Sequence, residues 1–353
     1  MEPPELISLP EQTGVRFWSP GFHAKPPILV GRDRLDANAH NAMRGSWDKS
    51  FYEERPAVLT ELSNVYVVAE GLIFYSRGRL YTDSITQHNT DEIALAYQAI
   101  RKCIESKPSP HPGMFALALK RGAKNYGHWL AEMLPMAYYS NYLSPSSIDY
   151  FIVPDAYGGM KSVIEQSMSL IGVKPERLFP HSGKPLLTSK LTVINGLTAH
   201  GVYMSPLVID ILRVLASQVK GRGHEKILVS RKSASGRRLI DEQRFEDLAK
   251  AKGYVVLDPG SMTLHDQISA FKSAKSILGV AGAGMTNMAF SSSGAKAFLL
   301  YPDNMPDTFF WFIGIHNQLQ FHDIRCTCEG PPIRGMPPWN RSIAVPTEVI
   351  DMI

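Results

Sequence analysis

The sequence predicts an α/β fold divided into two domains, and three observations support this. The 353 residues are enough for two medium-sized domains, and a composition of 44% hydrophobic and 20% charged residues is typical of a globular protein. Short apolar runs suited to buried strands alternate with helix-length segments through most of the chain. A polar, glycine-rich stretch at residues 220–224 separates two such series. Each series predicts a mostly parallel sheet covered by helices.

The N-terminal part predicts an irregular arm and then the first domain. Residues 1–60 are rich in proline, glycine, asparagine and charge, with little periodicity, and we expect an irregular arm there. The first domain, residues 61–220, begins with hairpin-like alternation at 63–84 and helical spacing at 91–105. Further strands are expected at 114–119, 148–153 and 191–194, and further helices at 126–143, 160–171 and 204–219.

The second domain, residues 221–325, has the clearer pattern. Strands are expected at 226–230, 254–257, 276–280 and 296–301, with helices at 241–252, at 264–274 and from residue 286. This alternation with short connections is Rossmann-like. Two such domains in one chain predict a ligand cleft between them. The tail, residues 326–353, continues an aromatic and proline-rich stretch and could return to the first domain.

Charge and cysteine content exclude several classes of protein. The net charge of +4 suits an anionic ligand or contact with an anionic membrane surface, but it is too small and scattered to indicate nucleic acid. Three cysteines make no disulfide framework, and Cys326-x-Cys328 lacks the usual zinc spacing. No signal peptide and no apolar run of about 18 residues is visible, so we expect a cytoplasmic protein, with peripheral contact to the inner membrane face left open.

A glycine turn within residues 276–287 predicts a phosphate site. An apolar strand runs into Gly-Ala-Gly, where backbone N–H groups can approach an anion, and a helix beginning near Thr286 would point its positive end there. The spacing G-x-x-G-x-G and the position after the third strand do not fit a dinucleotide fingerprint, which follows the first strand. Tight packing of helix on strand is the ordinary alternative.

Arginines follow the first strand of the same domain. Arg231 comes directly after that strand, and Arg237 and Arg238 follow a few residues later. The carboxyl end of a strand faces the ligand crevice in open α/β sheets, and guanidinium groups give permanently charged, bidentate donors to diphosphate. A solvated basic loop would explain a single arginine. Three arginines at one strand end, in the same domain as the glycine turn, favour a diphosphate site. The absence of an Asp-x-Asp pattern favours a site without a metal ion.

A histidine and a glutamate open the long helix expected at 126–143. His128 and Glu132 are four residues apart, so they share one helical face just after a strand end. One of them could act as the general base for an attacking hydroxyl. From the spacing alone, an ordinary surface His–Glu pair is the more frequent explanation. No Ser-His-Asp order or nucleophile elbow supports hydrolase chemistry.

Together, these motifs resemble four ordered blocks of glycosyltransferase family 61, over roughly residues 60–325. The similar segments are Asn125-Tyr126-x-His128-Trp129-Leu130-x-Glu132, Ser230-Arg231 with residues 237–242, the helix containing Gln267, and residues 282–287. Two positions depart from the family pattern. Ala281 stands where many members carry histidine, and Asp241 stands where asparagine is usual. The loss of histidine puts a catalytic role at position 281 in doubt.

The resemblance implies a GT-B architecture, with two Rossmann-like domains and the nucleotide-sugar donor in the C-terminal one. It implies inverting transfer to a glycan or glycolipid acceptor, with no cofactor and no obligatory metal. For a bacterial member it implies a role in capsule, lipopolysaccharide or other surface-glycan assembly. The sequence favours no particular oligomeric state.

Residue roles follow from the motifs and the resemblance together. Glu132 is expected to take the proton of the acceptor hydroxyl, with His128 orienting it or substituting for it, and Asn125 lies on the acceptor side. The expected donor-binding residues are Ser230, Arg231, Arg237, Gln267, Gly282, Ala283, Gly284, Met285, Thr286 and Asn287. Ala281 motivates an alternative, a catalytically degenerate protein that binds a nucleotide sugar or a partner protein. A nucleotide-binding enzyme of another kind, such as a methyltransferase, is disfavoured by the late glycine turn.

Overall fold

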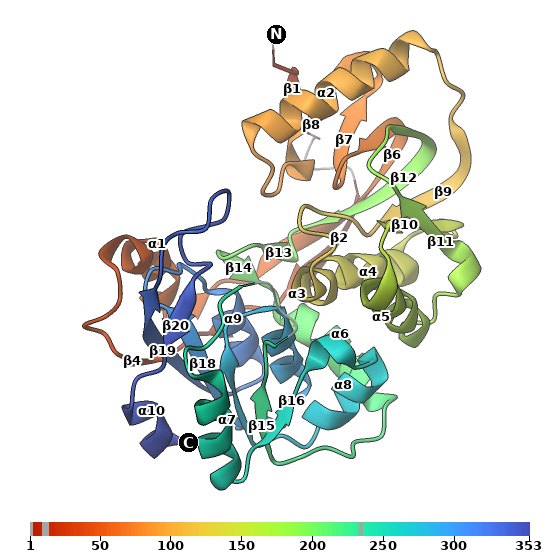
Figure 1. Ribbon diagram of the computed structural model, residues 1–353. Helices are drawn as coiled ribbons and strands as arrows, with labels where there is room; N and C mark the ends of the chain where they lie inside the picture. Colours follow the sequence, from red (N-terminus) through yellow and green to blue (C-terminus); the bar gives the residue numbers. More distant parts are fainter. Residues whose placement is uncertain (1–2, 9–13, 233–235) are drawn as a thin grey trace. The chain divides into compact units, whose positions relative to one another are not determined.

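The computed structural model describes residues 3–8, 14–232 and 236–353, which form two compact units (Figure 1). Unit 1 contains Met1–Pro20 and Glu54–Ile211, and unit 2 contains Gly21–Glu53 and Leu212–Ile353. The chain therefore passes from one unit to the other three times. Each unit is described by itself below.

This division differs from the domain boundaries expected from the sequence at both ends of the chain. Residues 21–53, expected to belong to an irregular arm, fold with unit 2, where β4 (Ile28–Val30) pairs with β19 (Gln320–Glu329). The tail also folds with unit 2, because β20 (Ser342–Ala344) pairs with β19. Both additions cover an edge of β19 whose backbone groups would otherwise lack partners. Of the expected arm, residues 1–2 and 9–13 lie outside the described part.

Unit 1 contains a nine-stranded mixed sheet. Its order is β1 (Leu6–Ile7), β8 (Leu80–Tyr81), β7 (Leu72–Tyr75), β6 (Arg55–Val68), β12 (Leu186–Asn195), β9 (His111–Leu117), β10 (Tyr150–Pro154) and β11 (Leu178–His181), and β2 (Val15–Ser19) pairs with β6. The hairpin expected at 63–84 is present as antiparallel β6 and β7. From β12 to β11 every neighbouring pair is parallel, as expected from the strand–helix alternation.

Helices and short elements complete unit 1. Asn89 and Glu92 form a capping box at the start of α2 (Thr90–Glu105), which packs on β6 and β7 (Figure 1). The other elements are η1 (Ser76–Gly78), η2 (Thr82–Ser84), α3 (Tyr126–His128), the π-helical η3 (Trp129–Met133), α4 (Leu134–Leu143), α5 (Gly158–Leu170), η4 (Pro175–Arg177), β13 (Thr198–Ala199), β14 (Tyr203–Met204) and the first part of α6 (Pro206–Ser217).

The helix expected as one element over 126–143 is interrupted by the π-helical turn η3. The N–H of Leu134 donates to the carbonyl of Trp129, five residues earlier. Pro135, the next residue, has no N–H to donate to the carbonyl of Ala131, so the ordinary i→i−4 pattern is not available there. The wider turn carries Glu132.

Unit 2 contains a seven-stranded sheet that is parallel except at β20. Its order is β16 (Val255–Leu257), β15 (Lys226–Val229), β17 (Ser276–Val280), β18 (Lys296–Pro302), β19 and β20, with β4 beside β19. The strand–helix alternation expected between residues 226 and 301 is confirmed. The other elements are β3 (Phe22–His23), α1 (Ala37–Trp47), β5 (Phe51–Tyr52), α7 (Glu242–Ala251), η5 (Pro259–Ser261), α8 (Leu264–Phe271), η6 (Ala283–Phe290), α9 (Phe309–His316) and α10 (Glu348–Met352).

The helical turn after the glycine segment begins earlier than expected. We expected a start near Thr286, but the 3-10 helix η6 begins at Ala283, directly after Gly282. None of the helices in the described part of the chain combines the length and the apolar character that a membrane span needs.

Candidate active site

The strand order of unit 1 places one candidate site at a topological switch point. The chain leaves β9 to form β10 and β11 on one side of it, and then returns to form β12 on the other side. The connections after β9 and β12 therefore diverge at the carboxyl ends of the strands, where open α/β sheets bind ligands. His128 and Glu132 follow β9, and His200 follows β12 in the β13–β14 hairpin.

These three side chains form a cluster, called the histidine cluster below, in which Glu132 is hydrogen-bonded to His200 and lies at ion-pair distance from His128. Glu132 Oε1 lies 2.7 Å from His200 Nδ1 and 3.4 Å from His128 Nδ1. The two imidazole rings are stacked, with centroids 4.5 Å apart and planes at 11°. The Glu132 side chain is only 4% exposed, whereas those of His128 and His200 are 19% and 25% exposed. The carboxylate therefore lies beneath two histidines that solvent can reach.

The histidines decide the charge state of the carboxylate. Burial by itself raises the pKa of Glu132, but the hydrogen bonds and charges of His128 and His200 outweigh burial and hold the pKa below its ordinary value. Lys120 also lies near the carboxylate, and its Nζ donates to Thr198 Oγ1 at 3.1 Å. Burial lowers the pKa of Lys120, and the charge of Glu132 partly opposes this. Glu132 is therefore anionic at neutral pH, and a group with so low a pKa accepts protons poorly.

Local contacts hold His128 in place. The side-chain oxygen of Asn125 accepts from the N–H groups of Gly127 at 2.9 Å and His128 at 3.4 Å, so Asn125 caps the helix that carries the histidine. Gly122 lies against the imidazole: a Cβ there would be 3.2 Å from His128 Nδ1, and its φ of +83° also favours glycine. The indole of Trp129 donates to Ser167 Oγ of α5 at 2.8 Å.

Sequence reasoning missed His200 and Lys120. Glu132 and His200 are 68 positions apart, so no helical or strand period relates them. The available signal was position, since both missed residues follow parallel strands at the carboxyl edge of the sheet.

His128, Glu132 and His200 are also a group whose ligand atoms, all within 4.8 Å of one another, could hold a metal ion. Their geometry suits a hydrogen-bonded cluster better. The lone pair of an imidazole nitrogen lies in the ring plane, and in stacked, nearly parallel rings these lone pairs do not converge on one ion at the 2.0–2.1 Å that zinc requires. A chelate would need one ring to rotate.

Unit 2 has a switch point of the same kind between β15 and β17. The chain leaves β15 for β16 on one side and then returns to β17 on the other. Arg231 follows β15, and the glycine turn follows β17. A Cβ on Gly282 would collide with the guanidinium of Arg231. Because the φ of Gly282 is 174°, an extended value open to any residue, this close approach is what requires glycine.

Two half-buried arginines near this turn have buried Nε atoms without a hydrogen-bond partner among the described residues. Arg231 Nη2 donates to the carbonyl of Gly236 at 3.0 Å, and Arg237 Nη1 lies 3.4 Å from Met305 Sδ. Burial lowers the pKa of Arg231 to about 10, and the like charge of Arg237 adds to the effect. Buried, unpaired cationic donors are costly unless an anion neutralises them, so this site suits an anionic ligand.

Backbone strain accompanies the second arginine. Arg237 has a φ of +54°, in the left-handed region that residues other than glycine and asparagine rarely adopt. Strain of this kind concentrates at functional sites. Ala281, at the position where many family members carry histidine, is fully buried, and its N–H donates to the carbonyl of Leu300 at 2.9 Å.

The remaining expected donor residues fall into two groups. Ala283 and Gly284 are partly exposed at the start of η6, whereas Ser230, Gln267, Gly282, Met285, Thr286 and Asn287 are buried. Asn287 Nδ2 donates to Gln267 Oε1 at 2.7 Å and to the carbonyl of Gly284 at 3.1 Å. Asn287 and Gln267 were expected to bind the donor, and their mutual hydrogen bond favours a role in supporting the glycine turn. Ser230 Oγ accepts from the N–H of Lys232 at 3.3 Å, also a local contact.

The two units define the class of the protein: an α/β fold with two parallel-rich sheets, consistent with a GT-B-like two-domain architecture. Residues 126–298 match the family model of Glycosyltransferase 61. The chain therefore contains a glycosyltransferase family 61 domain, a domain of enzymes that move a sugar from a donor to an acceptor. The match covers every candidate residue of both switch points except Lys120 and the cap Asn125. No curated protein is significantly similar to the chain.

Proposed function

We propose that the protein is an inverting, metal-independent glycosyltransferase that moves a sugar from a nucleotide-sugar donor to a hydroxyl of a glycan or glycolipid acceptor. The observation that carries the proposal is the buried Glu132 carboxylate, 2.7 Å from His200 Nδ1 and covered by two histidines. A role in surface polysaccharide biosynthesis at the cytoplasmic side of the membrane, including peripheral membrane contact, is proposed from the resemblance to bacterial family members.

A histidine, rather than Glu132, removes the proton of the acceptor hydroxyl. When Nδ1–H of an imidazole donates to a carboxylate, Nε2 is the nitrogen that takes up a proton, and the anion stabilises the imidazolium that forms. His200 is favoured over His128 because its contact with Glu132 is shorter and its side chain is more exposed. Glu132 then orients the base. The activated hydroxyl attacks the anomeric carbon opposite the leaving diphosphate, so the configuration inverts.

The arginines of unit 2 stabilise the leaving nucleoside diphosphate. The guanidinium groups of Arg231 and Arg237 and the backbone N–H groups of Ala283 and Gly284 provide fixed donors for charge that grows in the transition state. These donors take the role that a divalent cation has in other nucleotide-sugar sites.

Replacing the histidine tests the assignment of the base. A thermal-shift screen of nucleotide sugars first identifies the donor. With that donor, His200→Ala should lower kcat by roughly 10²-fold or more, because general base catalysis contributes about that much, while the affinity for the nucleoside diphosphate stays unchanged. His224→Ala, which changes an exposed histidine of unit 2, is the matched control and should keep wild-type turnover. Near-wild-type turnover of His200→Ala would refute the proposed base.

Two further measurements examine the mechanism. NMR of freshly formed product should show the anomeric configuration inverted relative to the donor, and retention would contradict a single displacement. Activity should survive EDTA. A complete loss of activity in EDTA that Mn²⁺ restores would refute metal independence. His128, Glu132 and His200 would then be the group of residues to test as metal ligands.

The second candidate function is a catalytically degenerate protein that binds a nucleotide sugar or a partner protein. It is favoured by Ala281, which leaves no titratable group where many family members carry histidine. Purified protein that binds a nucleotide sugar but neither transfers nor hydrolyses it would support this candidate over the enzyme.

A further inference from the structure

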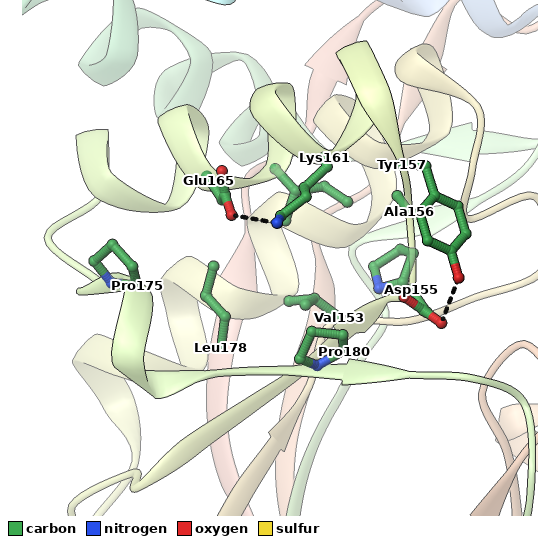
Figure 2. Close-up of a pocket in the computed structure, with 11 residues that line it drawn as sticks. Val153, Asp155, Ala156, Tyr157, Lys161, Glu165, Pro175, Leu178 and Pro180 are labelled. Carbon is green, nitrogen blue, oxygen red and sulfur yellow. Dashed lines mark hydrogen bonds and ion pairs between the residues drawn. The ribbon is translucent and has the colours of Figure 1, made fainter.

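A cavity in unit 1 lies beside β10 and β11, the two strands that follow β9. It has a volume of about 270 Å³ and is bounded by α5 on one side and by η4 and β11 on the other (Figure 2). Val153, Ile164 and Leu178 give it an apolar interior. Figure 2 shows polar groups on the lining as well, with Lys161 and Glu165 on α5 and Asp155 and Tyr157 on the loop before it.

The chemistry of this cavity fits a sugar ring. A sugar presents apolar C–H faces and a rim of hydroxyl groups, and so requires apolar surface together with hydrogen-bonding groups. Tyr157 is 77% exposed, and its hydroxyl donates to Asp155 Oδ2 at 3.4 Å. Lys161 and Glu165 form an exposed ion pair at 3.7 Å. The volume is near the lower end of ligand pockets, roughly 300 Å³, so one sugar ring fits and a nucleotide sugar does not.

The cavity and the histidine cluster both follow carboxyl ends of parallel strands in the unit 1 sheet. β9 and β10 are parallel neighbours with Leu117 opposite Ile152, so their carboxyl ends are adjacent. Neighbouring strands are about 4.8 Å apart, which places the cavity, beside β10 and β11, roughly 5–10 Å along the edge from the strand that His128 follows. The Trp129–Ser167 hydrogen bond joins the helical segment that carries Glu132 to α5, the helix that lines the cavity.

We propose that this cavity is an acceptor subsite that binds a sugar residue one or two positions away from the residue whose hydroxyl reacts. The acceptor is then an oligosaccharide or a longer glycan, recognised along the edge of the unit 1 sheet. The inference rests on the proposed function, because it takes the histidine cluster as the place of reaction.

Saturation-transfer NMR with free sugars tests the subsite. The probe is a panel of neutral mono- and disaccharides of glucose, galactose, mannose and N-acetylglucosamine at millimolar concentration. At least one of them should receive saturation from the wild-type protein. Tyr157→Ala should weaken that binding by about fivefold or more, because an aromatic surface of this size contributes roughly that factor. Tyr142→Ala is the matched control, since Tyr142 is also exposed, at 60%, but lies on α4 outside the cavity.

The outcomes separate this inference from the proposed function. Equal saturation transfer with the wild type and Tyr157→Ala overturns the subsite, and so does a wild-type protein that binds no sugar of the panel. A thermal-shift measurement with nucleoside diphosphates is made on the same samples. Nucleoside diphosphates should raise the melting temperature of the wild type and of Tyr157→Ala by the same amount. A wild-type protein that binds no nucleotide contradicts the proposed function, whereas the saturation-transfer result alone decides whether the cavity binds a sugar.

Discussion

Gly282 has no side chain, and this leaves room for the charged guanidinium of Arg231 beside the glycine turn. The guanidinium of Arg231 occupies the space that a Cβ on Gly282 would need, and it is held there by the carbonyl of Gly236. A residue with a side chain at position 282 must therefore displace the half-buried guanidinium of Arg231. The glycine turn and the arginine are coupled by contact as well as by their place in the sheet.

Gly282→Ala should weaken nucleoside diphosphate binding by roughly tenfold, about 1.4 kcal/mol, because the displaced guanidinium no longer faces the anion. Isothermal titration calorimetry measures the effect. Gly45→Ala is the matched control: nothing lies within 4 Å of a Cβ there, and alanine should stabilise α1 by about 1 kcal/mol without changing affinity. Unchanged affinity in Gly282→Ala would show that Arg231 does not bind the diphosphate.

The charge of Glu132 should appear in the pH dependence of stability. Its pKa in the folded protein is below the ordinary value of 4.5, so the stabilisation it provides is fully present above that pH and is lost as the pH falls below it. Glu132→Gln should therefore cost about 3 kcal/mol of unfolding free energy at neutral pH, with a difference from wild type that narrows in acid. Urea titrations across pH measure both effects. A pH-independent difference would mean that the carboxylate is not held as an anion.

A surface ion pair provides the comparison for that experiment. Glu225 contacts Lys275 with both side chains 69% exposed. Glu225→Gln should change stability by less than about 1 kcal/mol at any pH, because solvent screens exposed pairs.

Spacing in the sequence identified two members of the histidine cluster and not the others. His128 and Glu132 are four positions apart in one helical segment, so a period relates them. His200 and Lys120 lie on connections between elements, and only the strand order brings them to Glu132. The roles of Asn287 and Gln267 also depended on structure, because burial and their mutual hydrogen bond are three-dimensional facts.

At the scale of elements, the π-helical turn η3 decides how Glu132 is presented. Leu134 donates to a carbonyl five residues back, and Pro135 prevents the tighter pattern at the next position. The sequence contained the proline, but an uninterrupted helix was the simplest expectation from its periodicity. Turns of this type often occur at functional sites.

Pro135→Ala should let the helix regain its ordinary hydrogen bond from residue 135 to the carbonyl of Ala131. Glu132 would then rotate relative to His200, and kcat should fall roughly 10²-fold, as expected when a catalytic group is displaced by about an ångström. Circular dichroism should show an intact fold. Pro145→Ala, in the exposed loop after α4, is the control and should be fully active. Wild-type turnover in Pro135→Ala would show that the wide turn does not position the site.

At the scale of the whole molecule, the path of the chain joins distant segments into unit 2. Arg325 pairs with Asp323 in the core, contacts Met43 Sδ at 3.3 Å and faces the ring of Trp47 at 5.8 Å. Arg34 Nε donates to the carbonyl of Arg325 at 3.0 Å. Residues from 21–53 thus surround a buried cation nearly 300 positions away.

A fragment of residues 212–353 should therefore fail to fold alone. Without residues 21–53, the fragment exposes an edge of β19 and leaves Arg325 without the side chains that cover it. Removing part of a core typically lowers the free energy of unfolding by several kcal/mol. Adding a peptide of residues 21–53 should restore cooperative thermal unfolding. Cooperative unfolding of the fragment by itself would contradict this account. Denaturation followed by circular dichroism distinguishes the two results.

By itself, the sequence determined the features that depend on neighbouring residues. The period of apolar residues gave the strand–helix alternation of both units, the spacing of His128 and Glu132 gave one face of a helix, and glycine at 282 and 284 gave a turn open to an anion. Each depends on the backbone geometry of a short segment, which local side chains set.

Tertiary structure decided what depends on strand order and burial. It placed Arg231 against Gly282, added His200 and Lys120 to Glu132, and assigned residues 21–53 and the tail to unit 2. The lowered pKa of Glu132 is also the reason why we propose a histidine, rather than this carboxylate, as the base. These facts arise because hydrogen bonds between strands and burial of charge join residues far apart in the chain, and no local pattern encodes such pairs.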